Sequence, residues 1–179
     1  ITAFHGTNQQ FEQFSQDKAR LLNDFYGGGV AYFTENFQVA KQYAAAAVKR
    51  TGGDPVIYRS QLHIKKLFDV DGNYTGKDIK PLIGSNYELF ARAAGLLNLG
   101  ADKYRVLSDL KSCDIVLTGE QLYKGMSGGM RKTAVARDKL KKNGYDALRY
   151  NGGVNMAAVR HNVYIMYYAR DIRITGTIK

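Results

Sequence analysis

The sequence between residues 29 and 43 is Gly29-Val30-Ala31-Tyr32-Phe33-Thr34-Glu35-Asn36-Phe37-Gln38-Val39-Ala40-Lys41-Gln42-Tyr43. Its β-branched and aromatic side chains predict a strand at residues 30–34. Asn36 is a favourable N-cap and predicts a helix from Phe37 to about Lys49. The glycines before the strand predict a loop at residues 24–29. We therefore expect a loop, a strand and a capped helix in direct succession.

The pattern on either side of this stretch predicts strands near both ends of the chain and helices in the middle. Alternating or β-branched segments predict strands at residues 1–5, 56–64, 145–150, 162–168 and 172–178. Apolar residues three and four apart predict helices at residues 86–99, 102–111 and 131–142. The capping-box pattern Thr118-Gly119-Glu120-Gln121 predicts one more helix. The expected fold class is α+β, with a single domain over residues 1–179.

Composition narrows the class of protein. With 179 residues, 45% of them hydrophobic, the chain can build a core, and it has no run of about 18 apolar residues to cross a membrane. The single Cys113 excludes an intramolecular disulfide and a multi-cysteine zinc site, and the spacing of His63 and His161 is not typical of metal ligands. We expect no metal and no membrane partner. Because the chain begins with Ile1 instead of Met, we expect a piece of a longer polypeptide, whose localisation stays open.

The charge balance favours an acidic partner. The chain has 26 Lys and Arg against 16 Asp and Glu, a formal net charge of +10. Residues 124–149 hold eight basic side chains against Asp138 and Asp146. The basic residues are Lys124, Arg131, Lys132, Arg137, Lys139, Lys141, Lys142 and Arg149. This stretch is either a surface for RNA, DNA or an acidic protein, or a solvated helix face.

Three segments together resemble a known family. They are Phe4-His5-Gly6-Thr7, then Tyr32-Phe33-Thr34 with Tyr43 in the following helix, and finally Asn162-Val163-Tyr164-Ile165-Met166-Tyr167. In this order they resemble the ADP-ribosyltransferase superfamily, in the diphtheria-toxin-like branch that includes the poly(ADP-ribose) polymerases. With residues 144–150 they also resemble small prokaryotic and phage ADP-ribosyltransferase domains of polyvalent proteins and polymorphic toxins. The resemblance implies a split antiparallel β-sheet core with peripheral helices.

The resemblance also implies a site for NAD, used as substrate. The nicotinamide ring is a flat cation, which suits stacking between the faces of Tyr32 and Tyr43. His5 would hydrogen-bond the adenosine-side ribose, and Gly6 would let the ligand approach the backbone. Arg20 is either a pyrophosphate ligand or a solvated surface residue. The full predicted cofactor-binding set is His5, Gly6, Thr7, Arg20, Tyr32, Phe33 and Tyr43.

One position departs from the family pattern. The family usually has a glutamate immediately before the Tyr-Ile-Val-Tyr-like strand, and here Val163 stands in its place. Strand alternation directs Asn162 to the opposite face, unless a bulge shifts the register and brings it into the site. Asp146 and Asp171 are other acids close in sequence. We expect the bulge, so the predicted catalytic set is His5, Tyr32 and Asn162.

The resemblance implies a mono-ADP-ribosyltransferase, an enzyme of the glycosyltransferase class that modifies a host protein or nucleic acid. Such a toxin or effector domain would act in the cytoplasm of a target or host bacterium, after secretion or phage delivery. An immunity protein or antitoxin would be a further partner. Two alternatives stay open: a weak or inactive module that binds NAD, ADP-ribose or nucleic acid, and an NAD glycohydrolase that uses water as acceptor.

Overall fold

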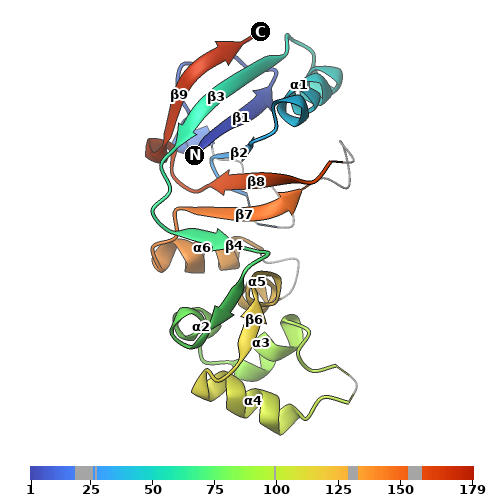
Figure 1. Ribbon diagram of the computed structural model, residues 1–179, viewed down its shortest axis with the longest axis vertical. Coiled ribbons are helices and arrows are strands. Elements are labelled where there is room, and N and C mark those ends of the chain that lie inside the picture. The colour runs from blue at the N-terminus through green and yellow to red at the C-terminus, as the bar shows by residue number, and fades with distance from the viewer. Residues whose placement is uncertain (19–25, 27, 99, 129–132, 153–158) are drawn as a thin grey trace. The chain divides into compact units, whose positions relative to one another are not determined.

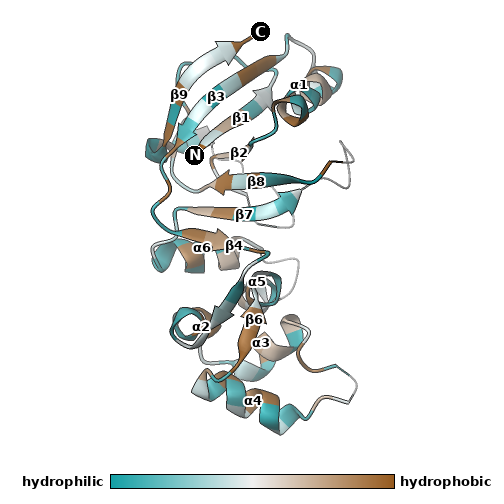
Figure 2. Cartoon of the chain, viewed as in Figure 1, coloured by the Kyte–Doolittle hydropathy of each residue, from teal (hydrophilic) through white to brown (hydrophobic). Residues whose placement is uncertain are grey.

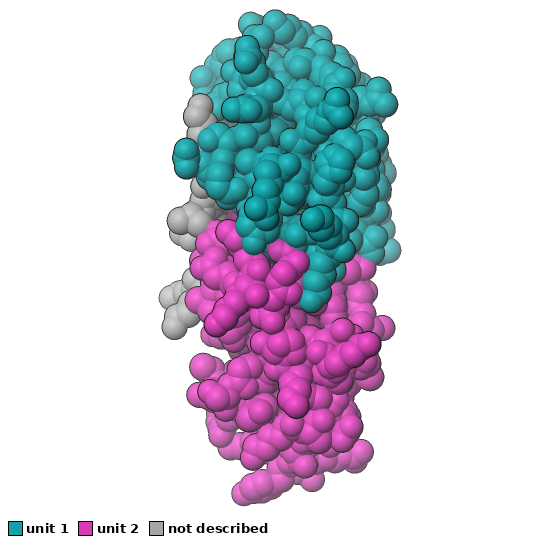
Figure 3. Space-filling model, turned by 90° about the vertical axis from the view of Figure 1, so that its left-hand side faces the viewer, with its two compact units in different colours: residues 1–20, 29–67, 146–179 teal, residues 21–28, 68–145 magenta. Residues whose placement is uncertain are grey.

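The computed structural model describes residues 1–18, 26, 28–98, 100–128, 133–152 and 159–179. The chain forms two compact units (Figure 3). Unit 1 comprises residues 1–20, 29–67 and 146–179, and unit 2 comprises residues 21–28 and 68–145. The sequence pattern did not predict this division. The chain passes from one unit to the other at residues 67–68 and 145–146, and neither point lies in a Pro- or Ser-rich linker.

Unit 1 is built on an antiparallel sheet (Figure 1). Its strands are β1 (Thr2–Thr7), β2 (Ala31–Thr34), β3 (Val56–Leu62), β7 (Ala147–Gly152), β8 (His161–Met166) and β9 (Ile172–Ile178). They lie in the order β7-β8-β2-β1-β3-β9, and each neighbouring pair is antiparallel. The predicted α+β class is confirmed. The predicted end strands are present, within a few residues of their expected bounds.

The sheet is nearly divided between β1 and β2. Strands β1 and β3 stay in register from Thr2↔Gln61 to Thr7↔Val56, whereas β1 and β2 share the single pair Phe4↔Thr34. The strands β1-β3-β9 and β7-β8-β2 therefore form two groups, which run in clearly different directions in Figure 1.

Helix α1 (Phe37–Thr51) packs on one face of this sheet, which we call the α1 face. Asn36 caps the helix as predicted, because its side-chain oxygen accepts hydrogen bonds from the backbone N–H groups of Gln38 and Val39. The Phe4 and Phe37 rings meet edge to face, with centroids 5.5 Å apart. Phe4 pairs with Thr34 across β1 and β2, so these two side chains both point to the α1 face.

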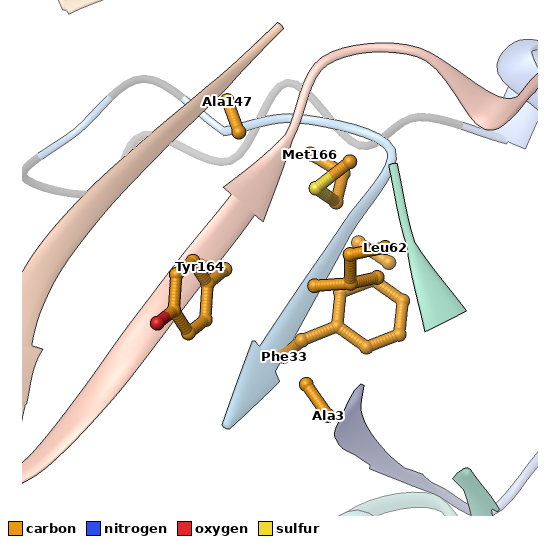
Figure 4. Packing of buried hydrophobic residues seen from close by; sticks show 7 residues of the cluster. Ala3, Phe33, Leu62, Ala147, Tyr164 and Met166 are labelled. Atoms are coloured by element: carbon orange, nitrogen blue, oxygen red, sulfur yellow. The ribbon is translucent and has the colours of Figure 1, made fainter. Parts of the chain in front are cut away.

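The opposite face, called the core face, carries a hydrophobic core cluster of unit 1 (Figure 4). Side chains from β1, β2, β3, β7 and β8 meet there. They are Ala3, Ala31, Phe33, Leu62, Ala147, Tyr164 and Met166. Strand alternation therefore places Phe33 and Tyr164 on one side of the sheet and their neighbours Tyr32 and Val163 on the other.

Unit 2 is mostly helical. Its helices are α2 (Gly76–Ile83), α3 (Tyr87–Ala93), α4 (Lys103–Ser112), α5 (Gly119–Ser127) and α6 (Thr133–Lys142). A two-stranded sheet joins β5 (Asn73–Thr75) to β6 (Val116–Thr118), and β4 (Leu67–Asp69) begins where unit 1 ends. Figure 2 shows hydrophilic and hydrophobic sides on α4, whose Leu110 is buried. Short 3-10 turns occur in unit 1 at Gln16–Lys18 and Ala169–Asp171.

Local capping explains where several of these helices begin and end. The predicted capping box is present, since Thr118 and Gln121 each accept a hydrogen bond from the other's backbone N–H. The helix predicted at 86–99 ends at Ala93, because Gly95 adopts a left-handed φ of 73° and closes the last turn. Helix α2 and strands β4 to β6 were not predicted. Their segments are too short for a clear period, and α2 contains Pro81.

Candidate functional site

His5 lies where β1 and β2 separate. Its Nδ1 is 2.8 Å from the backbone oxygen of Tyr32. A carbonyl oxygen can only accept, so Nδ1 carries the hydrogen and Nε2 is the acceptor of the neutral ring. The ring packs against Phe14 and Phe33, at centroid distances of 5.4 and 5.6 Å. Burial lowers the pKa of His5 from 6.5 to about 4, so the imidazole is neutral at pH 7.

The peptide groups of Gly6 face the same place. Ile1 exchanges two hydrogen bonds with Leu62, of 3.0 and 2.7 Å, which marks a hydrogen-bonded pair between the chain start and β3. Alternation then directs the N–H and C=O of His5 toward β3, and those of Phe4 and Gly6 toward β2. Phe4 is paired with Thr34 of β2, whereas Gly6 is not paired with a residue of β2. One backbone donor and one acceptor thus face the point where the strands part.

Position 6 requires a glycine for a structural reason that differs from the predicted ligand contact. A Cβ at this position would lie 1.8 Å from the Ala40 carbonyl oxygen and 2.9 Å from the Ala44 nitrogen. The glycine therefore allows α1 to pack closely on β1. The sequence suggested that it makes room for a ligand, but the helix backbone fills that space. Only the peptide groups of Gly6 are placed to meet a ligand.

The two predicted stacking tyrosines lie on or beside the α1 face. Tyr32 is half-buried and shares this face with Thr34 by alternation. Tyr43 lies on α1 itself and is 41% exposed. Phe33 points to the core face and is 1% exposed, so the predicted ligand contact by Phe33 is replaced by a packing role. The side chains of His5 and Tyr32 leave their strands on opposite faces, and the His5 ring is hydrogen-bonded to the backbone carbonyl of Tyr32.

Thr7 and Arg20 complete the predicted binding set. The Thr7 hydroxyl accepts a hydrogen bond from the Gln9 backbone N–H at 3.2 Å, which closes a turn after β1. Arg20 lies outside the described residues.

Asn162 does not enter the α1 face. The pairs Gly152↔His161, Asn151↔Asn162 and Tyr150↔Val163 follow without a shift, so the expected bulge is absent at these positions and that prediction is wrong. Asn162 Nδ2 instead donates to Glu35 Oε2 at 2.9 Å. A regular ladder leaves Asn162 on the core-face side, two positions from Tyr164.

Glu35 joins Asn162 and Tyr164 in a polar cluster that the sequence did not reveal. Tyr164 Oη donates to Glu35 Oε1 at 2.8 Å, while Asn162 holds the other oxygen of the carboxylate. Burial, followed by the hydrogen bond to Glu35, raises the pKa of the Tyr164 hydroxyl to about 12, although the Arg149 guanidinium opposes this. The pairing Thr34↔Val163 puts Glu35 opposite Asn162, so only the strand register could have predicted the cluster.

Val163 stands on the α1 face, opposite Thr34, and is 4% exposed. The two other nearby acids do not take the place of a glutamate there. Asp146 Oδ2 accepts from the backbone N–H groups of Lys65 and Lys66, at 2.6 and 2.9 Å. Asp171 lies in a 3-10 turn, where its carbonyl accepts from the His63 N–H at 2.9 Å. The Asp146 carboxylate therefore holds loop backbone in place, whereas Asp171 contributes its backbone carbonyl.

The predicted basic stretch is split between the units. Arg149 belongs to unit 1, whereas the other members that the structure describes belong to unit 2. Lys124 pairs with Glu120 at 2.7 Å, and Arg137, only 13% exposed, pairs with Asp138 at 2.9 Å. Arg131 and Lys132 lie outside the described residues. The basic residues in the last turn of α6 are Lys139, Lys141 and Lys142.

Comparisons with known proteins give little further information. No protein-family model and no curated protein matches the chain. One solved structure, described as "Crystal structure of an anti-CRISPR protein", is similar with 11% sequence identity and a TM-score of 0.37. The match covers 99% of this chain and 95% of that chain. A likeness at this level establishes neither the family nor the function.

In the part of the chain that the structure describes, no group of three or more His, Cys, Asp and Glu side chains is arranged to hold a metal ion. No helix there is long and apolar enough to cross a membrane.

Proposed function

We propose that the protein is a mono-ADP-ribosyltransferase that transfers ADP-ribose from NAD to a macromolecular target. The observation that supports this best is the parting of β1 and β2 after the single pair Phe4↔Thr34. The His5 imidazole bonds the Tyr32 carbonyl there, and the Gly6 peptide groups face the same point. The segments that resemble the family thus come together in space.

The groups at this point suit the nicotinamide half of NAD. A primary carboxamide offers one acceptor and two donors, which match the N–H and C=O of Gly6. The cationic ring can stack on a tyrosine face, and Tyr32 lies on the adjoining α1 face while Tyr43 lies on α1 itself. The neutral His5 ring has its Nε2 as an acceptor for a ribose hydroxyl. We propose these four residues as the NAD-binding set, and we propose no metal.

The transfer itself needs mainly positioning. The bond between the ribose C1′ and the nicotinamide nitrogen breaks, and its electron pair leaves with nicotinamide, which becomes neutral. The target's nucleophile bonds to C1′ and releases its proton. The transition state resembles an oxocarbenium ion, so holding NAD in a reactive geometry lowers the barrier. With Val163 in place of a glutamate, we propose slow, single transfer instead of polymer synthesis.

The charge of the chain supports an acidic target. The formal net charge of +10 would attract nucleic acid or an acidic protein by long-range steering. Together with the resemblance to toxin and phage domains, this supports a role as an effector in the cytoplasm of a bacterium. An immunity protein or antitoxin is a proposed partner of such an effector.

The test is incubation of the protein with adenylate-labelled NAD and a bacterial lysate. We expect label to enter a macromolecule, and either protease or nuclease digestion to release it, which identifies the target class. A matched reaction with Tyr32→Ala should lose most of the label, and His5→Ala should lose at least about tenfold. Nicotinamide release without labelled target would identify an NAD glycohydrolase.

A non-catalytic binding module is the second candidate, and Val163 is the observation that favours it. A valine that is 4% exposed can neither polarise a ribose hydroxyl nor activate a nucleophile. Calorimetry separates the two candidates. Binding of NAD or ADP-ribose, with no NAD consumption in the presence of the bacterial lysate, would establish the binding module and refute the enzyme.

A further inference from the structure

His161, at the start of β8, has a buried nitrogen without a hydrogen-bond partner. The side chain is 9% exposed, and Nδ1 is 2.9 Å from the backbone oxygen of Val159. Because that oxygen only accepts, Nδ1 carries the hydrogen of the neutral ring and Nε2 is left as an acceptor. Nε2 is fully enclosed and has no partner among the described residues. The imidazole is thus fixed in one tautomer, with an unused acceptor.

This nitrogen lies beside Val163. Gly152 is directly opposite His161 across the ladder between β7 and β8. A Cβ on Gly152 would lie 2.6 Å from Val163 Cγ2 and 3.0 Å from His161 Nε2, so the two side chains share one face and are close neighbours. Val163 pairs with Thr34, which makes this the α1 face, the face of Tyr32. The glycine at 152 is what leaves room for the imidazole.

Leaving this acceptor unpaired is unfavourable for the folded protein. A buried polar group without a partner costs about 1–3 kcal/mol, and an apolar residue of similar size at position 161 would avoid that penalty. Buried polar groups nearly always have partners, and none of the described residues supplies one to His161 Nε2. A neutral imidazole nitrogen suits a hydroxyl donor.

We propose that His161 is a ligand-contacting residue, whose Nε2 accepts a hydrogen bond from a hydroxyl of the nicotinamide-side ribose of NAD. The inference rests on the proposed function, because NAD is the ligand whose ribose would reach the position of Val163. The contact polarises the hydroxyl and orients the ribose, and no proton is transferred in it. His161 would therefore do part of the work of the absent carboxylate, without its negative charge.

Two substitutions at one position test the proposal. His161→Asn keeps a donor near the Nδ1 position, toward Val159, but removes the acceptor at Nε2. His161→Gln carries an amide oxygen to about the Nε2 position. His63→Asn is the matched control, since His63 is an exposed imidazole elsewhere in unit 1. The measurements are NAD consumption, NAD affinity by calorimetry and Tm.

We expect His161→Asn to lower kcat/KM for NAD at least about tenfold while Tm stays unchanged or rises. His161→Gln should recover part of this loss, and His63→Asn should behave as wild type. If both His161 variants lose kcat/KM at unchanged Tm, the contact is still supported. The amide of Gln would then be unable to replace the imidazole in it. Wild-type kcat/KM in His161→Asn overturns the proposal. So does a rate that falls only together with Tm, because that shows a structural role.

Failure of the proposed function gives a different result. A wild-type protein that binds NAD but does not consume it in the presence of the bacterial lysate refutes the transferase, and His161→Asn must then weaken NAD binding at least about fivefold. Equal affinity of wild type and His161→Asn overturns the contact in that case. A wild-type protein that does not bind NAD overturns both proposals.

Discussion

His5 makes the stability of the protein depend on pH in the mildly acidic range. Its ring is enclosed by Phe14 and Phe33 and bonded to the Tyr32 carbonyl, and burial lowers its pKa to about 4. In the unfolded chain the pKa returns to about 6.5. The folded protein therefore binds this proton less readily than the unfolded chain. The contribution of His5 is fully present above about pH 6.5, and it is lost as the pH falls toward 4.

The size of the effect follows from the two pKa values. A depression from 6.5 to about 4 corresponds to at most about 3.4 kcal/mol, since each pKa unit is about 1.4 kcal/mol. Between pH 7 and 5 the titration is incomplete, and the free energy of unfolding should fall by about 2 kcal/mol on account of His5. With an m-value of about 2 kcal/mol per molar urea, the unfolding midpoint should shift by about 1 M.

The assay compares wild type with His5→Asn by urea unfolding at pH 7 and pH 5. The asparagine amide can still donate to the Tyr32 carbonyl but does not titrate, so the carboxylates that also titrate cancel in the difference. Wild type should lose about 2 kcal/mol more than the variant between the two pH values. The titration of the His5 ring protons by NMR measures the pKa directly. A His5 pKa near 6.5, with the same pH dependence in both proteins, would refute the reasoning.

Three further predictions concern single features of the structure. Gly6→Ala should lower the free energy of unfolding by about 2–3 kcal/mol, measured by urea unfolding, because the new methyl group meets the α1 backbone. Asn162→Ala should leave NAD consumption unchanged, because the side chain is engaged with Glu35, while Tm falls slightly. Replacing Lys141 and Lys142 by Glu should spare NAD hydrolysis measured without target but slow target labelling, more at low salt than at high salt. Equal loss of NAD hydrolysis and target labelling would contradict a steering role for these lysines.

The parts of the fold that could be predicted are those set by neighbouring residues. Asn36 and Thr118 start helices through bonds to backbone groups two or three residues away, so their signals lie in the sequence itself. The short strand at Asn73–Thr75 and helix α2 depend on packing within unit 2 and carry no clear period. The early end of α3 depends on the left-handed backbone of Gly95, which a periodic pattern does not show.

The candidate site likewise has features that could be predicted from the sequence and features that could not. The resemblance predicted His5 and Tyr32 in one site. In the structure the His5 ring is hydrogen-bonded to the backbone carbonyl of Tyr32, whereas the two side chains leave their strands on opposite faces. The cluster of Glu35 with Asn162 could not be predicted, because it requires the register between β2 and β8. A register error of one residue exchanges the two faces of a strand, and this is why Asn162 was expected on the wrong face.

The identity of residue 163 sets a limit on the chemistry that this face can support. A carboxylate there would favour the developing positive charge on the ribose, yet the position is 4% exposed and opposite Thr34, so it would also have to be desolvated. A valine avoids the cost of desolvating a carboxylate, but it provides no negative charge to stabilise the ribose cation. The neutral acceptor of His161, beside it, can hold a hydroxyl without offsetting a full positive charge. Under the proposed function, rate enhancement must therefore come mainly from orienting NAD, which is consistent with one slow transfer to each target.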